Sequence, residues 1–182
     1  MKYVIASDIH GSAYWCERLL ETVENEGADG LILLGDLLYH GPRNTLPDGY
    51  DTQKTFAMLN AIKDKITAVR GNCDSEVDQM VLEFPMLADY ALLPTTAGTL
   101  FLTHGHLFNA ENPPLLKKGD VLLNGHFHVP TFSELENGGV YVNCGSVALP
   151  KDGYPHSCIL FEDGTFTWLD LETGGMFDSF TL

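Results

Sequence analysis

Basic residues are scarce in this chain, and it has no long hydrophobic run. The 182 residues include 10 Lys and Arg against 25 Asp and Glu, which gives a formal net charge of −15 at pH 7. Because so negative a surface repels phosphate backbones at long range, nucleic-acid binding is not expected. No apolar run approaches the roughly 18 residues that a membrane span needs, so we predict a soluble cytoplasmic protein without a membrane partner.

Paired cysteines and repeats are missing as well. The cysteines at positions 16, 73, 144 and 158 form no CxxC motif, which argues against a zinc knuckle or a redox motif. We expect Cys16, Cys144 and Cys158 to be reduced thiols in the core or in turns. The length favours a single domain over residues 1–182, and the 45% hydrophobic fraction suffices for a sizeable core.

Short apolar runs followed by polar turns characterise the first 75 residues. The runs 3–6, 31–34 and 66–69 each predict a buried strand. Ser12 can cap a helix that closes at Gly27, and a second helix opens near Asp51 or Thr52. Two helices that join three apolar strands indicate right-handed crossovers and a mainly parallel sheet.

The second half of the chain is rich in β-type runs. Residues 100–103, 121–123 and 140–142 predict strands, and residues 158–169 predict an antiparallel hairpin around a turn at 162–164. We therefore expect two packed sheets. The stretch 40–51 is rich in Gly, Pro and Asn and predicts a long loop, which is often a functional feature.

Potential metal ligands follow five of the predicted strands. They are Asp8, His10, Asp36, Asn72, His104, His126 and His128. Ligands in open α/β sheets gather beyond the carboxyl ends of the strands, so residues far apart in sequence can converge on one crevice. If the segments after the strands are extended, alternation places Asp8 beside His10 and His126 beside His128 as paired ligands. Glycines 11, 35, 71, 105 and 125 permit tight turns there.

This ligand set predicts a particular chemistry. Carboxylates, imidazoles and an amide oxygen suit divalent ions such as Mn²⁺, Fe²⁺ or Zn²⁺. Seven ligands exceed one tetrahedral site and suit two ions about 3.5–4 Å apart, with one carboxylate bridging them. Such a centre is locally cationic, attracts an anionic substrate, and lowers the pKa of a water between the ions so that hydroxide can attack a phosphoryl group.

The same residues resemble a known family. Its five ordered motifs are matched by Asp8-x-His10, Gly35-Asp36, Gly71-Asn72-Cys73-Asp74, His104 and Gly125-His126-x-His128. On these residues the chain resembles the calcineurin-like metallophosphoesterases, and the turn Asn143-Cys144-Gly145-Ser146 is similar to the Asn-Pro-Gly-Ser turn of small bacterial members. The resemblance implies a four-layer α/β/β/α sandwich, in which two mixed sheets are flanked by helices.

The resemblance also implies roles for the ligands. One ion would be held by Asp8, His10, Asp36 and His128, and the other by Asp36, Asn72, His104 and His126, so that Asp36 bridges the two ions. Mn²⁺ is the ion most expected, with Zn²⁺, Fe²⁺ or Ni²⁺ as alternatives. The residues expected to take part in catalysis are Asp36, Asn72, Cys73 and Asp74. A homo-oligomer is compatible with the resemblance.

Cys73 stands where many family members carry a histidine. A neutral thiol adds no positive charge beside a dianionic monoester, whereas a diester carries only one negative charge and depends less on such a group. We therefore predict that the protein hydrolyses small phosphodiesters. Two alternatives stay open: a phosphomonoesterase, which would need another acid near Cys73, and a non-catalytic metal-binding scaffold of the same fold.

Several polar residues allow two interpretations. His40, Arg43 and Asn44 could line the substrate entrance, or the loop that carries them could be packed or contact another subunit. His106 could orient a metal ligand or lie in an exposed turn. Arg70 could point toward the site or toward the other face of its sheet. The acidic residues of the first helix, Glu17, Glu21 and Glu24, predict a solvated face.

Overall fold

Strands and helices alternate in the first part of the chain. The computed structural model describes residues 1–182. Its elements up to residue 79 are β1 (Lys2–Ala6), α1 (Ala13–Asn25), β2 (Gly30–Leu33), α2 (Thr52–Ala61), the short 3-10 helix η1 (Lys63–Lys65), β3 (Ile66–Ala68) and α3 (Glu76–Gln79). The predicted strands and the two longer helices are confirmed within a few residues, whereas α3 was not predicted.

Each of the two longer helices begins at a residue whose side chain caps it. Ser12 Oγ accepts a hydrogen bond from the Trp15 N–H at 3.2 Å, and the Asp51 carboxylate accepts one from the Lys54 N–H at 3.0 Å. These bonds satisfy amides that a helix N-terminus leaves free. The predicted solvated face of α1 is confirmed, because Glu17, Glu21 and Glu24 are exposed. None of the helices combines the length and hydrophobicity that crossing a lipid bilayer requires.

The rest of the chain contains strands and loops but no helix. Its strands are β4 (Tyr90–Pro94), β5 (Thr99–Thr103), β6 (Val121–Asn124), β7 (Thr131–Glu134), β8 (Val140–Asn143), β9 (Ser157–Glu162), β10 (Thr165–Asp170) and β11 (Met176–Thr181). The strands β4, β7 and β11 were not predicted. All three lie at the edges of sheets.

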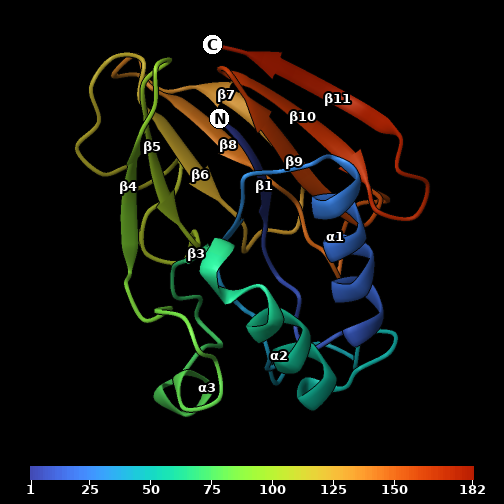
Figure 1. The fold of residues 1–182 in the computed structure, drawn as a ribbon. Helices are drawn as coiled ribbons and strands as arrows, with labels where there is room; N and C mark the ends of the chain where they lie inside the picture. The colour runs from blue at the N-terminus through green and yellow to red at the C-terminus, as the bar shows by residue number, and fades with distance from the viewer.

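The strands form two mixed sheets. The six-stranded sheet has the order β11-β10-β9-β1-β2-β3, in which β1, β2 and β3 run parallel and β9 pairs antiparallel with β1. The five-stranded sheet has the order β4-β5-β6-β8-β7, with β5, β6 and β8 parallel. Figure 1 shows the two sheets facing each other, with α1 and α2 outside the six-stranded sheet.

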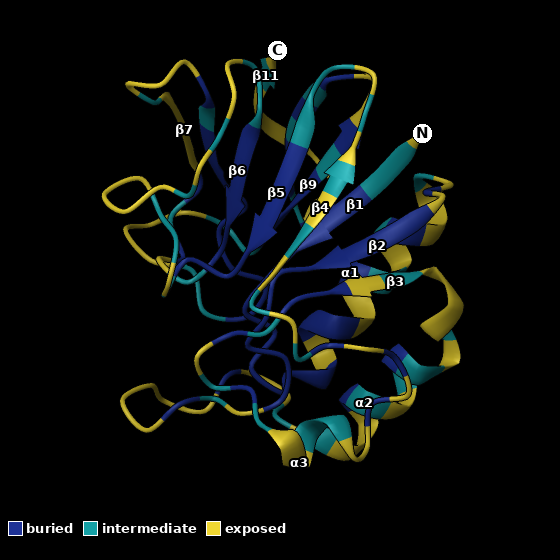
Figure 2. Cartoon of the chain, turned by 90° about the vertical axis from the view of Figure 1, so that its left-hand side faces the viewer, coloured by how far each residue is buried: buried dark blue, intermediate teal, exposed yellow.

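Hydrophobic side chains fill the space between the sheets. Ile5 and Ile32 of the six-stranded sheet belong to the same buried cluster as Leu100 and Leu123 of the five-stranded sheet. A second cluster joins the six-stranded sheet to α1, where Trp15 and other residues are buried. The strands at the centre of each sheet are accordingly dark blue in Figure 2. The predicted sandwich is confirmed, although it has few flanking helices.

Loops cover the outer face of the five-stranded sheet. Phe101, Leu122 and Tyr141 form a small cluster there, against which Phe108 and Leu116 of the loop between β5 and β6 pack. No helix follows Gln79, so the helical layer lies mainly on the six-stranded sheet. The loops after β1, β2, β3, β5 and β6 meet at one end of the sandwich, where they bring together the polar residues described next.

Candidate metal centre

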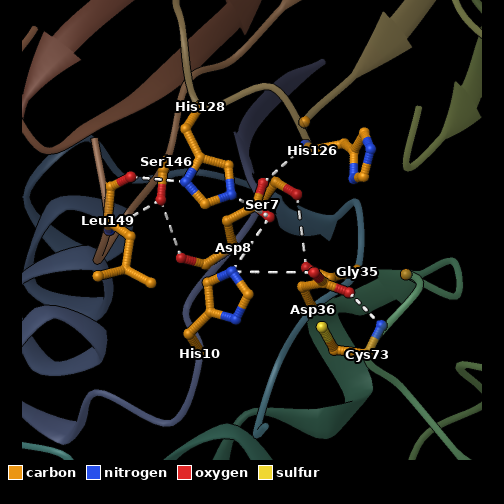
Figure 3. Close-up of polar contacts among 12 residues, drawn as sticks. Ser7, Asp8, His10, Gly35, Asp36, Cys73, His126, His128, Ser146 and Leu149 are labelled. Carbon is orange, nitrogen blue, oxygen red and sulfur yellow. Dashed lines mark hydrogen bonds and ion pairs between the residues drawn. The ribbon is translucent and has the colours of Figure 1, made fainter. Parts of the chain in front are cut away.

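Five loops deliver the predicted ligands to one place. Asp8 and His10 follow β1, Asp36 follows β2, Asn72 follows β3, His104 follows β5, and His126 and His128 follow β6. Most of them are buried: Asp8 and His104 expose none of their surface. Figure 3 shows Asp8, His10, Asp36 and His128 with their polar groups directed toward one another. Residues up to 120 positions apart thus share one buried cluster.

The backbone at this cluster is left-handed rather than extended. The φ angles are +60° at Asp8, +48° at His10, +56° at Asp36, and +64° at both His126 and His128. The structure does bring Asp8 beside His10, but a left-handed backbone, and not strand alternation, turns both side chains inward. The expected pairing of His126 with His128 is wrong, because His128 contacts Asp8 and His126 contacts His104. The left-handed conformation is costly for a residue with a Cβ and persists only where the surrounding structure imposes it, which is typical of functional sites.

Asp8, His10 and His128 form the first group of donors. Asp8 Oδ1 lies 3.5 Å from His10 Nε2 and 3.1 Å from His128 Nε2. Asp8 Oδ1 and His10 Nε2 are both buried without a hydrogen-bond partner. Buried polar atoms normally have a hydrogen-bond partner. Two neighbouring ligand atoms that lack one are what a cation-binding site is expected to show when no cation is included. These residues fit a divalent ion.

His104 is at the centre of the second group. Its Nε2 lies 3.4 Å from Asp36 Oδ2, 3.1 Å from Asn72 Oδ1 and 3.2 Å from His126 Nδ1. Asp36 also approaches the first group, because its Oδ2 is 3.8 Å from His10 Nε2. The Asp36 carboxylate therefore stands between the two groups of donors, as a bridging ligand would.

Backbone carbonyls fix the orientation of three imidazoles. The Nδ1 atoms of His10, His104 and His128 lie 2.8, 2.8 and 2.6 Å from the carbonyl oxygens of Tyr39, Leu34 and Leu149, respectively. In the neutral ring, an Nδ1 that donates to a carbonyl leaves Nε2 unprotonated and free to coordinate. The Nε2 atoms of all three rings consequently face the carboxylates.

Asp74 lies behind the site and not in it. Its carboxylate accepts hydrogen bonds from the backbone N–H groups of Asp36, Leu37 and Gly71, at 2.8, 2.9 and 2.8 Å. It does not line the cavity described below. These hydrogen bonds tie together the turns that carry Asp36 and Asn72, and the catalytic role expected for Asp74 stays a prediction.

The charges in the cluster depend strongly on one another. Burial alone would raise the pKa of Asp8, but the charges of His128 and His104 and the neighbouring His10 ring hold it well below its usual range. Burial would likewise lower the pKa of His104, but the charge of Asp8 and the contact with the Asp36 carboxylate raise it to about 9. Burial and the charge of His104 lower the pKa of His126 to about 4. The carboxylates are thus ionised and His126 is neutral near pH 7.

Cys73 places a neutral sulfur beside the centre. Its Sγ belongs to a group with His10 and Asp36 whose ligand atoms lie within 4.8 Å of one another. The Cys73 N–H donates to Asp36 Oδ1 at 2.8 Å. Burial and the negative charge of Asp36 raise the pKa of the thiol to about 12, so the sulfur stays protonated.

A polar cavity of about 290 Å³ opens onto the centre. It is lined by His10, Asp36, Asn72, Cys73, His126 and His128, and by Gly41, Pro42, Arg43, Asn44, Phe127 and Lys151. Arg43 and Asn44 thus line the cavity, whereas the ring of His40 packs against Tyr39 and Tyr50 within the loop. Sequence reasoning missed Phe127, whose position between two ligands was a usable signal, and Lys151, for which the sequence offers none.

The structure also shows where Arg70, His106 and the other cysteines lie. Arg70 forms an ion pair with Asp89 at 2.6 Å and does not line the cavity. The His106 ring lies 5.4 Å from that of His104 and does not line the cavity either. The expected buried thiols are confirmed, because Cys16, Cys144 and Cys158 are free and fully buried.

Comparison with known proteins identifies the family. Residues 1–164 match the calcineurin-like phosphoesterase superfamily domain. The chain belongs to the calcineurin-like phosphoesterase superfamily. Among members of this superfamily, Phosphodiesterase YfcE from Escherichia coli (strain K12) is 51% identical to the chain over 157 residues, which cover 86% of this chain and 85% of that protein. The predicted family is therefore confirmed.

Solved structures support the fold. The structure of Yfce, a phosphoesterase from E. coli, is 45% identical to the chain, covers 100% of this chain and 99% of its own, and superposes with a TM-score of 0.95. Vps29 from Entamoeba histolytica, complexed with Zn²⁺, is 17% identical, covers 100% and 99% of the two chains, and has a TM-score of 0.64. The second likeness concerns the fold alone.

Proposed function

We propose that the chain is a metal-dependent phosphodiesterase that acts on small molecules through two divalent ions. The observation that carries the proposal is the position of Asp36, whose Oδ2 lies 3.8 Å from His10 Nε2 and 3.4 Å from His104 Nε2. One carboxylate between two groups of donors is the arrangement of binuclear hydrolases. The relative YfcE, at 51% identity, is named a phosphodiesterase, which supports the same reaction.

We assign the first ion to Asp8, His10, Asp36 and His128, and the second to Asp36, Asn72, His104 and His126. Carboxylate, imidazole and amide donors suit Mn²⁺, Fe²⁺ and Zn²⁺, and we propose Mn²⁺. When bound, such ions lower the pKa of water toward neutrality and offset the charge that develops on phosphoryl oxygens. The protein contributes fixed Nε2 atoms, two ionised carboxylates and a cavity that admits the phosphate.

The neutral Cys73 thiol favours a diester over a monoester. A monoester brings two negative charges and therefore benefits more from the positive charge of a protonated histidine. His10 is close to Cys73, but its Nδ1 contacts the Tyr39 carbonyl and its Nε2 faces Asp8 and Asp36, so it is not free to serve as that acid. A diester has one charge fewer and needs this help less.

The cavity supports a small substrate. A volume of about 290 Å³ lies at the lower end of small-molecule sites. The net charge of −15 would repel a polyanion along the rest of the surface. We therefore propose a small phosphodiester in place of a nucleic acid.

The test compares two aryl esters. Chelator-treated protein should hydrolyse bis(p-nitrophenyl) phosphate faster than p-nitrophenyl phosphate, and only after Mn²⁺ is added back. Faster monoester hydrolysis would favour a phosphomonoesterase. The absence of turnover of both esters with Mn²⁺, Fe²⁺, Zn²⁺ or Ni²⁺ would contradict an enzymatic role and favour a scaffold.

A further inference from the structure

Two cations line the cavity without an acidic partner. Five of the 10 Lys and Arg residues form ion pairs with carboxylates elsewhere in the protein. Arg43 and Lys151 are the only Lys or Arg residues that line the cavity, and neither is in an ion pair. The chain has 25 acidic residues, yet Arg43 and Lys151 pair with none of them. No ion pair within the protein therefore accounts for these two cations.

The two cations come from separate loops that are tied to the metal centre. Lys151 follows β8, and its backbone N–H donates to the His128 carbonyl at 3.2 Å. Arg43 follows β2, in a loop whose Gly41 lies so close to Cys73 that a Cβ on Gly41 would be 3.3 Å from the sulfur. One cation is therefore anchored beside the first group of donors and the other beside Cys73.

The charge of the scissile phosphate does not explain these cations. A phosphodiester carries a single negative charge, and two divalent ions would bring four positive charges against the carboxylates of Asp8 and Asp36. The centre would already exceed the charge of the phosphate. Further cations on the wall of the cavity are useful when the organic part of the substrate is itself anionic.

We infer that Arg43 and Lys151 select phosphodiesters in which one organic group carries a further negative charge, either a phosphate or a carboxylate. The inference rests on the proposed phosphodiesterase function. Arg43 and Lys151 bind the anionic arm, while the phosphate that reacts would bind to the ions held by the ligand residues. Their contribution is to substrate binding and specificity, so it appears in kcat/KM for anionic diesters relative to neutral ones.

The experiment uses three diesters with the same p-nitrophenolate leaving group. Their second arms are ethyl, 2-carboxyethyl and 2-phosphonoethyl, so the leaving group is the same and the arms differ in their terminal group. The Mn²⁺-loaded protein should hydrolyse at least one anionic diester with a kcat/KM roughly fivefold or more above that of the ethyl ester. A preference for the phosphonate alone identifies a phosphate arm, and equal preference for both identifies any anion.

Variants connect this preference to the two side chains. The double variant R43Q/K151Q should reduce the ratio of anionic to ethyl kcat/KM to about 1, whereas K118Q should keep it. Lys118 is a suitable control because it is exposed, in no ion pair and absent from the cavity. The preference should also weaken as NaCl concentration rises, because exposed charges are screened.

Each contrary result has a distinct meaning. A ratio near 1 in the unmodified protein would overturn the inference, and so would an equal loss of kcat/KM for all three diesters in R43Q/K151Q. In either case, metal-dependent turnover of the ethyl ester would still support the proposed phosphodiesterase function. A ratio unchanged in R43Q/K151Q would also overturn the inference. The absence of metal-dependent turnover of every diester would contradict the phosphodiesterase, and the inference with it.

Discussion

Gly71 lies directly against the carboxylate of Asp36. A Cβ on Gly71 would stand 2.1 Å from Asp36 Oδ1 and 2.4 Å from the Asp36 backbone nitrogen, so no other residue fits without moving the carboxylate. Asp74 reinforces this contact, because its carboxylate accepts hydrogen bonds from both Asp36 and Gly71. The carboxylate between the two donor groups is therefore held by sterics as well as by hydrogen bonds.

The first prediction is that Gly71→Ala lowers metal-dependent activity by about 100-fold, because a displacement of about 1 Å at a reacting centre has an effect of that size. The measurement is kcat/KM for bis(p-nitrophenyl) phosphate. Gly175→Ala is the matched control, since its Cβ would be 3.3 Å from the nearest atom, the Thr173 hydroxyl, in an exposed loop. Activity of Gly71→Ala equal to that of Gly175→Ala would show that the packing against Asp36 does not matter.

The second prediction concerns the shared carboxylate. Asp36→Asn should reduce turnover by at least about 100-fold and lower the metal content, because it removes a charge from both groups of donors. Metal content is measured by mass spectrometry on dialysed protein, beside kcat for the diester. Substantial activity with a normal metal content would refute the bridging role of Asp36.

The third prediction concerns specificity. Cys73→His should raise the ratio of monoesterase to diesterase activity roughly tenfold, because a histidine adds a charge-assisted donor beside the dianion. Cys73→Ser, which stays neutral, should leave the ratio nearly unchanged. If the ratio is the same in both variants and the unmodified protein, residue 73 does not determine specificity.

The fourth prediction concerns pH. The pKa of His104 is raised to about 9, above its ordinary value of 6.5. Charged His104 therefore stabilises the metal-free fold fully below pH 6.5, and this stabilisation is lost as the pH rises through about 9. A metal ion requires the neutral ring, so Mn²⁺ affinity should increase with pH over the same window, with release of a proton.

Calorimetric titration of Mn²⁺ in buffers with different ionisation enthalpies measures this proton release. The His104 account predicts release of a proton near pH 7 and progressively less toward pH 9. Affinity that is constant or falls as the pH rises would contradict it.

The sequence predicts the central strands well because they are buried on both faces. The residues of β2 and β6 are all buried, so each appears as a continuous apolar run. The edge strands β7 and β11 were missed for the opposite reason. All four residues of β7 are exposed, and β11 has only one residue that is not, so no apolar pattern marks them. These strands form because they pair with a neighbouring strand, and the local sequence pattern carries no information about that pairing.

The ligand set was predictable because each member follows an apolar run, but the way it assembles was not. Alternation along a strand appeared sufficient to pair Asp8 with His10, yet both residues adopt positive φ. Only the packing of distant loops imposes that conformation, as in the hydrogen bond from the His126 N–H to Asp8 Oδ2 at 2.9 Å. The carbonyls that orient the histidines and the position of Lys151 likewise depend on tertiary structure alone.

The most direct test of the central claim is the number of ions that turnover requires. Mn²⁺ is added in measured amounts to metal-free protein, bound metal is quantified by equilibrium dialysis, and hydrolysis of bis(p-nitrophenyl) phosphate is followed in the same samples. The account predicts that activity reaches its plateau only when two ions are bound per chain. Full activity with one bound ion, or activity that persists without any, would contradict it.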